Sequence, residues 1–526
     1  MEVTKPEKQS VTVRDEMWSM PDGVRLFTRV VLPGDGTGTY PTVLKRSPYE
    51  KETQITDETY RRYESDPLLL RGYAVVLQHC RGRYGSEGEC IPYDDHERTD
   101  GLAALARIRL LPHYNGEIYF SGTSYTASVL LMMLNDDLPD LKGACFTVQT
   151  ESMYHRNFFN GLCRSYSGFT WWLSMVAQQH PKIAPDEEIF VRPYRDIMKR
   201  AIGMDIPAFT DTLMNDRYND FWKNDPRTGC MENLRVPVLL VGGWYDYYCY
   251  GMCSMWDKLP AETRARSAFL MGPWGHAASV PENSPYPFPH GDVPRERVAA
   301  WFDHLRLGTP YPYAEVGKFN YYVIGEDVWR AAGSPYGIAP REELYLTAAG
   351  KLQTKKAAPA AFTYRYDPDD RPRRDPHDAI CACPEAGKYP DTVSFFSDPF
   401  EKDISFFGPV AFRGTLSSDC DDTAFFIRVY LVENGVSYNL VDLATTLRHA
   451  EPDYRAGGLC RVEILSQPTA FTVKRGCALR VDISSYSDCF VPHANTAKHF
   501  ALETAPRVAH NTVHLGNAAL LLSLYE

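Results

Sequence analysis

A serine placed between a strand-like run and a helix-like run is the feature that most constrains how this chain can fold. Residues 117–123 read Glu-Ile-Tyr-Phe-Ser-Gly-Thr, an apolar run that breaks at Gly122, and Ser124 follows directly. A serine in such a turn has its hydroxyl exposed at the edge of the sheet, and the next amide points the same way. Thr126 replaces the last glycine of the common Gly-x-Ser-x-Gly elbow. This stretch alone therefore leaves an ordinary tight turn open.

An acid and a histidine follow at the ends of two later apolar runs. Residues 234–241 lead through two glycines to Asp246, and residues 268–271 lead through Gly-Pro-Trp-Gly to His276. Ser, Asp, His is the chain order of the α/β-hydrolase topology, in which all three lie on loops at one edge of a parallel sheet. Taken singly, the acid could be a helix cap and the histidine a surface ring. Taken together and in this order, they predict a triad of Ser124, Asp246 and His276.

The residues around these three resemble a known group of enzymes. The chain is similar in several motifs, in sequence order, to the cocaine esterase and X-prolyl dipeptidyl peptidase group of serine hydrolases. The matching segments are Met20–Leu26, Arg46–Tyr49, Arg81–Gly88, Gly122–Tyr125, Gly243–Asp246 and Gly272–His276, and, in the C-terminal part, Leu416–Asp419, Phe425–Val429, Ile483–Tyr486 and Asn495–Thr496. The resemblance covers most of the chain.

The resemblance implies two donors for an oxyanion hole. In this group a tyrosine hydroxyl from the Arg-x-Pro-Tyr loop acts with the amide after the nucleophile, which here are Tyr49 and Tyr125. A phenol with an ordinary pKa of about 10 stays protonated at neutral pH and can donate to a developing alkoxide. The alternative is that Tyr49 only packs in its turn. Ala127 departs from the glycine usual in the group, which affects packing more than chemistry.

Changes of pattern along the chain divide it into three parts. Residues 1–145 and 231–345 alternate strand-like and helix-like runs, as an α/β-hydrolase domain with a doubly wound sheet requires. In residues 146–230 the strands stop, and this aromatic-rich, helix-like insert is predicted to form a cap over the active site. Residues 346–526 carry short alternating strands, typical of a β-sandwich of the jelly-roll kind. The resemblance places this last domain against the active-site rim, with a shaping and dimerising role.

Aromatic residues in two segments are candidates for the substrate pocket. Phe169, Trp171 and Trp172 lie in the cap insert, and Tyr247 and Tyr248 follow the predicted acid. Most cap aromatics are expected to form the core of the cap itself, with one or two lining the acyl pocket. The two tyrosines could equally pack at the edge of the sheet.

Composition excludes several classes of partner. The net charge is −11 and the isoelectric point is about 5.7, so no basic face is expected to attract nucleic acid or an anionic membrane. The N-terminal residues carry no apolar leader and no stretch approaches the length of a membrane span, which predicts a cytoplasmic protein. The thirteen cysteines are scattered and are expected to be free thiols. No metal or cofactor is expected.

These observations predict a serine hydrolase that cleaves a small ester, an amide or a short peptide through an acyl-enzyme, most simply an acyl esterase. An X-prolyl dipeptidyl peptidase or an α-amino acid ester hydrolase is the alternative. Such an enzyme needs carboxylates near a substrate amine, and Glu151 or the run Asp186–Glu188 could supply them. A non-catalytic protein that binds a glycan or a partner through the β-domain is the remaining possibility. A homodimer is compatible with each of these functions.

Overall fold

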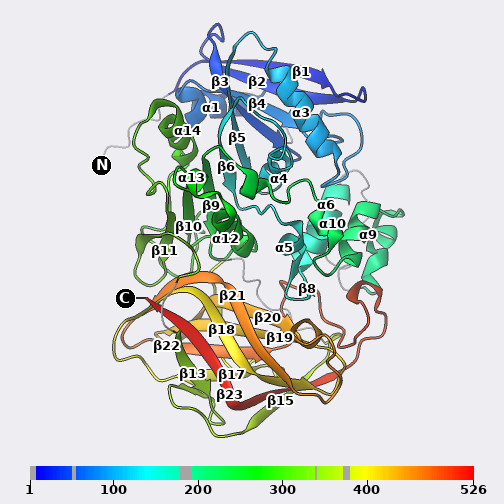
Figure 1. The fold of residues 1–526 in the computed structure, drawn as a ribbon, viewed down its shortest axis with the longest axis vertical. Coiled ribbons are helices and arrows are strands. Elements are labelled where there is room, and N and C mark those ends of the chain that lie inside the picture. The colour runs from blue at the N-terminus through cyan, green and yellow to red at the C-terminus, as the bar shows by residue number, and fades with distance from the viewer. Residues whose placement is uncertain (1–7, 50–54, 178–190, 338–340, 371–378, 526) are drawn as a thin grey trace.

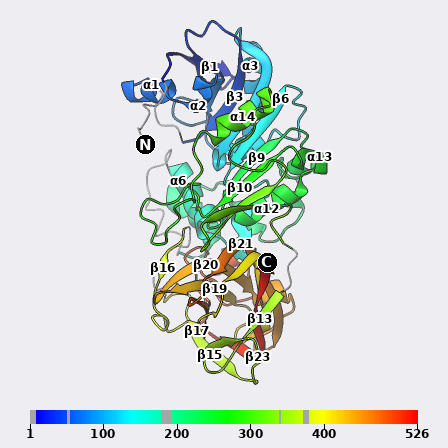
Figure 2. The ribbon, with the colours of Figure 1, turned by 90° about the vertical axis from the view of Figure 1, so that its left-hand side faces the viewer.

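The computed structural model describes residues 8–49, 55–177, 191–337, 341–370 and 379–525. Two large sheets occupy opposite ends of the long axis, and the short helices of the insert lie beside their junction (Figures 1 and 2). None of the helices within these ranges is long and apolar enough to cross a membrane. All thirteen cysteines are free thiols, most of them buried.

The first sheet has ten strands in the order β1-β2-β4-β3-β5-β6-β9-β10-β11-β12. Its central pairs, from β4 to β11, are parallel, whereas β1, β2 and β12 pair antiparallel to their neighbours. The strands are β1 (Val11–Ser19), β2 (Arg25–Pro33), β3 (Tyr40–Ser47), β4 (Ala74–His79), β5 (Tyr114–Thr123), β6 (Leu141–Thr147), β9 (Val238–Gly243), β10 (Ala268–Gly272), β11 (Phe319–Val323) and β12 (Val328–Ala332).

Helices flank this sheet, as parallel strands require. They are α1 (Asp57–Glu64), α2 (Pro67–Leu70), α3 (His96–Ile108), α4 (Tyr125–Leu131), α12 (Cys249–Lys258), α13 (Ala261–Arg264) and α14 (Arg297–Leu307). Every residue of β9 and β10 is buried, which explains their continuous apolar sequences. The register pairs Thr123 with Thr147 and Gly243 with Gly272. The carboxyl ends of β5, β6, β9 and β10 therefore meet at one edge.

The insert between β6 and β9 is mostly helical but contains a short hairpin. Strands β7 (Phe158–Phe159) and β8 (Leu162–Cys163) pair antiparallel around Asn160 and Gly161, whose φ values are 46° and 83°. The prediction that strands stop throughout 146–230 is wrong here, because Asn-Gly between apolar residues is a hairpin turn. The remaining elements are α5 (Met153–Asn157), η1 (Tyr166–Thr170), α6 (Trp171–Ala177), η2 (Tyr194–Asp196), α8 (Ile197–Ile202), α9 (Pro207–Met214), α10 (Asp220–Lys223) and α11 (Cys230–Asn233).

The C-terminal domain is built on a curled sheet of eleven strands. Its order is β16-β20-β19-β22-β17-β14-β13-β23-β18-β21, with β15 also paired to β23. The strands are β13 (Arg341–Leu346), β14 (Lys351–Gln353), β15 (Ala361–Tyr366), β16 (Ala382–Cys383), β17 (Val393–Ser397), β18 (Ile404–Ser418), β19 (Ala424–Glu433), β20 (Val436–Thr446), β21 (Cys460–Val473), β22 (Ala478–Ser484) and β23 (Ala509–Tyr525), with short helices α15 (Leu447–Ala450) and η3 (Phe500–Leu502).

The predicted boundary after residue 345 falls inside β13, which pairs with β23 and so belongs to the C-terminal sheet. The predicted fold class, an α/β-hydrolase domain with a helical cap and a C-terminal β-domain, is confirmed.

Candidate active site

The turn between β5 and α4 holds Ser124 in a backbone conformation that is uncommon for a residue with a side chain. Its φ is 55° and its ψ is −128°, a sparsely populated region that stores strain at functional sites. Gly122 makes the turn possible, because an added Cβ there would lie 2.5 Å from the backbone nitrogen of Ala127. The N–H of Tyr125, at the first position of α4, has no acceptor within its helix.

Hydrogen bonds from neighbouring segments fix this turn. The Thr126 hydroxyl donates to the Thr123 carbonyl over 2.6 Å and accepts from the Thr123 N–H over the same distance. The buried Gln149 amide donates to the Ser124 carbonyl over 2.9 Å, and the Ser124 N–H donates to Thr147 over 2.9 Å. Thr126 thus closes the turn in place of the missing glycine, and Gln149 anchors it to the end of β6.

The three residues predicted to act together are joined by hydrogen bonds. His276 Nε2 lies 2.9 Å from Ser124 Oγ, and His276 Nδ1 lies 2.9 Å from Asp246 Oδ2. Asp246 is 1% exposed, and its second oxygen, Oδ1, accepts from the Tyr248 N–H over 2.8 Å. With a proton on Nδ1, His276 donates to the carboxylate and accepts from the serine at Nε2. This geometry can deprotonate Ser124.

The loops that carry Asp246 and His276 pack directly against each other. Tyr245 N–H donates to the Trp274 carbonyl over 3.0 Å. Gly243 permits this approach, because a Cβ at that position would lie 2.1 Å from the same carbonyl oxygen. The close contact of the two loops therefore requires a glycine at position 243, three residues before Asp246.

Tyr49 lies beside the serine and is held by the cap. Trp171 Nε1–H donates to the Tyr49 hydroxyl over 3.1 Å. Burial raises the pKa of the Tyr49 phenol, and hydrogen bonds with Trp171 and Ser124 partly offset that rise. The residue as a whole is 39% exposed, whereas its hydroxyl end lies between Trp171 and Ser124. A phenol that stays protonated next to the serine, together with the free Tyr125 N–H, can stabilise an oxyanion.

Aromatic rings and a buried cation complete the surroundings. The Tyr247 ring stacks on the His276 imidazole with centroids 5.1 Å apart and 18° between the planes. The Tyr248 hydroxyl accepts from Arg156 Nε over 3.2 Å. The guanidinium of Arg156 in turn lies over the rings of Tyr93 and Trp171, at 4.7 and 4.8 Å from their centroids. These contacts fix the acid loop against the cap.

Comparison with known proteins agrees with this architecture over nearly the whole chain. A family model described as X-Pro dipeptidyl-peptidase (S15 family) matches residues 22–278, and one described as the X-Pro dipeptidyl-peptidase C-terminal non-catalytic domain matches residues 314–519. Cocaine esterase from Rhodococcus sp. (strain MB1 Bresler) is 24% identical over 557 residues, spanning 94% of this chain and 91% of that protein. The chain belongs to the X-Pro dipeptidyl-peptidase-like (S15) family. The predicted family and enzyme class are therefore confirmed: the protein is a serine hydrolase of the esterase or peptidase type.

Solved structures of CocE/NonD-type hydrolases and similar enzymes share the whole fold. An α-amino acid ester hydrolase superposes with a TM-score of 0.81 at 18% identity, covering 99% of this chain and 98% of that one. An aminopeptidase from the marine sediment archaeon Thaumarchaeota archaeon gives 0.82 at 20% identity, covering 100% and 98%. A CocE/NonD family hydrolase from Staphylococcus aureus gives 0.70 at 16% identity, covering 98% and 97%. At these identities the likeness concerns the fold alone.

A cavity of about 440 Å³ adjoins His276 in this S15-family chain, within the size range of small-molecule sites. It is bounded by Asp246, Tyr247 and His276 on one side and by C-terminal residues such as Asn439 and Gln467 on the other. The two domains meet tightly there. Tyr245 Oη donates to the Asn439 carbonyl over 3.1 Å, and Gln467 Nε2 donates to the Trp244 carbonyl over 2.7 Å. The C-terminal domain thus forms one wall of the cavity.

Two of the predicted pocket residues lie in the core of the cap and not at the cavity. Phe169 is fully buried in the cap against Tyr194 and Phe209. Trp172 is also buried and packs on Phe209 and Tyr93. Neither lines the cavity beside His276. Of the five candidates, Trp171 touches Tyr49 and Tyr247 lines the cavity.

The carboxylates considered for a substrate amine lie elsewhere or outside the described residues. Glu151 is 2% exposed, forms an ion pair with Lys258 and accepts from the Met231 N–H over 3.2 Å. These bonds account for both of its oxygens and tie the cap to α11 and α12. The run Asp186–Glu188 lies outside the described residues.

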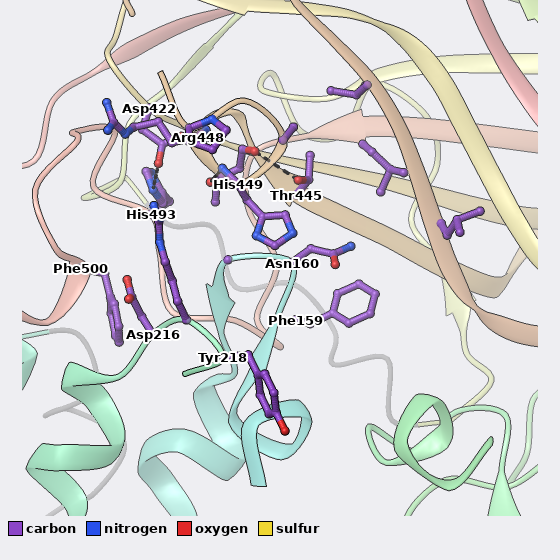
Figure 3. Close-up of a pocket in the computed structure, with 18 of the residues that line it drawn as sticks. Phe159, Asn160, Asp216, Tyr218, Asp422, Thr445, Arg448, His449, His493 and Phe500 are labelled. Carbon is purple, nitrogen blue, oxygen red and sulfur yellow. Dashed lines mark hydrogen bonds and ion pairs between the residues drawn. The ribbon is translucent and has the colours of Figure 1, made fainter. Parts of the chain in front are cut away.

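A larger cavity of about 890 Å³ lies between the cap and the C-terminal domain (Figure 3). It contains an ion pair between His493 and Asp422, with Nε2 and Oδ2 3.4 Å apart. Neither Ser124 nor His276 lines it, so its size does not make it the site of the serine chemistry. Phe159 at the tip of the β7–β8 hairpin borders both cavities.

Proposed function

We propose that this serine hydrolase cleaves carboxylic esters through an acyl-enzyme formed on Ser124. The observation that carries the proposal is the pair of 2.9 Å contacts that link Ser124 Oγ to His276 and His276 to the buried Asp246. The strained turn, the adjacent Tyr49 phenol and the Tyr125 N–H support it, because they present a nucleophile next to two donors.

In the proposed first step His276 Nε2 takes the proton from Ser124 Oγ while Oγ attacks the ester carbonyl carbon. The carbonyl oxygen becomes an oxyanion that accepts hydrogen bonds from the Tyr49 hydroxyl and the Tyr125 N–H. The tetrahedral species collapses when His276 returns the proton to the departing alkoxide, which leaves as an alcohol. Water then attacks the serine ester with His276 as base, releasing the acid and restoring Ser124.

Of the carboxylates predicted to bind a substrate amine, Glu151 is the one within the described residues, and its bonds to Lys258 and to the Met231 amide favour ester hydrolysis over recognition of an amine. A carboxylate engaged in this way does not offer a site to an incoming ammonium. Comparing a neutral ester such as 4-nitrophenyl butyrate with Ala-Pro-4-nitroanilide separates the two functions. The proposal expects turnover of the ester and little of the dipeptidyl anilide.

Steady-state kinetics of Ser124→Ala test the assignment. Loss of the nucleophile is expected to lower kcat for 4-nitrophenyl butyrate by roughly 10⁴-fold or more. Ser10→Ala, at an exposed serine before β1, is the matched control and should retain wild-type turnover. Residual turnover above a few per cent in a folded Ser124→Ala sample would exclude Ser124 as the nucleophile.

A further inference from the structure

A buried arginine that the proposed ester chemistry does not use lines the cavity beside His276. Arg164 follows strand β8 and is 9% exposed. Its guanidinium lies between two aromatic rings, 5.5 Å from the centroid of Phe159 and 5.3 Å from that of Phe490. Arg164 also forms a β-bridge to Phe490 of the C-terminal domain. The side chain is therefore fixed at the junction of cap and β-domain.

The guanidinium of Arg164 has no acceptor for its hydrogen bonds among the described residues. Its Nε is buried without a partner, and neither hydrogen bond nor ion pair joins its side chain to any residue within the described ranges. Leaving the buried Nε–H of a guanidinium unbonded is costly. Buried arginines elsewhere in native proteins are bonded, so a missing acceptor at a cavity wall points to a ligand.

A second buried arginine near the same cavity, Arg428, differs from Arg164 in having a carboxylate partner. The Nε of Arg428 is likewise buried without a hydrogen bond, but it forms an ion pair with Asp442, whose Oδ2 lies 3.5 Å away. Burial tends to lower the pKa of both guanidinium groups. For Arg428 the Asp442 carboxylate outweighs that effect and raises the pKa, whereas the pKa of Arg164 stays below its usual value. Asp442 thus pairs with Arg428. Of the other two acids in the cavity wall, Asp246 is bonded to His276, and Asp488 accepts from the Tyr486 hydroxyl through Oδ1.

The position of the cavity indicates which part of a substrate would occupy it. The wall includes His276 and Asp246 but none of Ser124, Tyr49 and Tyr125. In serine hydrolysis the histidine gives its proton to the leaving atom, so the leaving group lies on the histidine side of the serine. A guanidinium fork held between two aromatic rings matches the planar, bidentate geometry of a carboxylate.

We infer that Arg164 binds a carboxylate on the leaving group of the substrate. The favoured substrates are therefore esters, or amides, whose released alcohol or amine carries an acid group. This inference rests on the proposed function, because it uses Ser124 and His276 to orient the substrate. Arg164 is a specificity residue, and the acyl transfer itself does not require it.

Two acetate esters, one with a carboxylate on the leaving group and one with its methyl ester, test the inference. They are 4-acetoxybenzoate and its neutral methyl ester, methyl 4-acetoxybenzoate. The measured quantity is the ratio of their kcat/KM values in wild type, Arg164→Met and Arg164→Lys. Intrinsic reactivity is the same for every variant, so changes in this ratio report on the carboxylate alone. Arg461→Met, an exposed arginine of the larger cavity, is the matched control.

Arg164→Met is expected to lower the ratio at least tenfold while kcat/KM for the neutral ester stays within threefold of wild type. The ratio in Arg164→Lys should lie between those of wild type and Arg164→Met, because lysine keeps the positive charge but cannot form two parallel hydrogen bonds with a carboxylate. Arg461→Met should not change the ratio. An unchanged ratio in Arg164→Met overturns the inference, and so does a parallel loss for both esters, which would mean that Arg164 only supports the His276–Asp246 pair.

Two further measurements remove the remaining ambiguities. The 4-nitrophenyl monoester of glutaric acid carries its carboxylate on the acyl side. If Arg164→Met lowers kcat/KM for this ester but not for 4-acetoxybenzoate, the leaving-group assignment is wrong. If Arg164→Met does not fold, product inhibition of the wild type decides: 4-hydroxybenzoate should inhibit at a tenfold lower concentration than methyl 4-hydroxybenzoate, and equal inhibition overturns the inference. Failure of the proposed function would appear separately, as turnover of the neutral ester by Ser124→Ala.

Discussion

Trp171 in the cap donates its indole N–H to the hydroxyl oxygen of Tyr49, 3.1 Å away, in the catalytic domain. The Trp171 ring also packs on that of Tyr125, with centroids 5.1 Å apart. One cap residue therefore contacts both residues proposed to supply the oxyanion hole. A phenol that accepts from Trp171 keeps its own O–H free to point toward Ser124. The cap thus helps to orient the proposed oxyanion donor.

Tyr49→Phe is expected to lower kcat for a neutral ester by about 10²–10³-fold with a small change in KM, because a donor to the transition state is lost. Trp171→Phe keeps the phenol but removes the bond that orients it, so a smaller decrease is expected. Steady-state kinetics with 4-nitrophenyl butyrate measure both. Equal activity of Tyr49→Phe and wild type would assign Tyr49 to packing alone.

The alkaline behaviour of the enzyme follows from the same phenol. Burial raises the pKa of Tyr49 above the usual value of about 10. The donor O–H is lost only when pH rises through that raised pKa, so Tyr49 should cause no decrease of kcat/KM below pH 10. The hydrolysis of ethyl butyrate in a pH-stat between pH 7 and 10 checks this. A decrease centred below pH 10 that disappears in Tyr49→Phe would contradict the raised pKa.

Gly243→Ala is expected to separate the acid loop from the histidine loop. The new Cβ would meet the Trp274 carbonyl at 2.1 Å, and relief of this clash must move Asp246 relative to His276. We expect a loss of about 1–3 kcal/mol in stability and at least a tenfold loss of kcat. Thermal unfolding and ester kinetics measure the two effects. Gly333→Ala, which has open space around its Cβ, is the control and should change neither quantity.

Acid sensitivity is expected from a histidine at the end of β4. His79 is fully buried and neither ring nitrogen has a hydrogen-bond partner. Burial, aided by the charge of Arg29, lowers the pKa of His79 to about 4, against about 6.5 in the unfolded chain. The unfolded state binds the extra proton between these values, so stability falls as pH drops from 6.5 to 4.

The contribution of His79 is about 2–3 kcal/mol over that range. Denaturant unfolding of wild type and His79→Leu at pH 7 and pH 4.5 measures it. The variant should lose less stability on acidification than the wild type. Equal losses in the two proteins would show that His79 does not contribute to the acid sensitivity.

The placement of Ser124, Asp246 and His276 could be predicted because each carries a local signal: a buried apolar run, a glycine break and a polar residue at the end of a strand. The parallel register then brings three strand ends to one edge. Gln149 carries no such signal. Its bond to the Ser124 carbonyl depends on how the chain leaves β6, and no pattern in its neighbours indicates it.

Arg164 could not be assigned from sequence for a related reason. Its environment arises only where residues 488–491 of the C-terminal domain pair with the end of the β7–β8 hairpin. The hairpin itself could have been found, since Asn160-Gly161 between apolar pairs is a strong turn signal. The start of the C-terminal sheet at β13 depends on pairing with β23, far along the chain, and has no local mark.

Covalent labelling with a fluorophosphonate probe, followed by intact-mass analysis and peptide mapping, tests the central claim most directly. The account predicts one adduct per chain on the peptide that contains Ser124, blocked by prior incubation with a slowly hydrolysed ester and absent in Ser124→Ala. Labelling of another residue, or no labelling of a folded sample that hydrolyses esters, would contradict the assignment of Ser124 as the nucleophile.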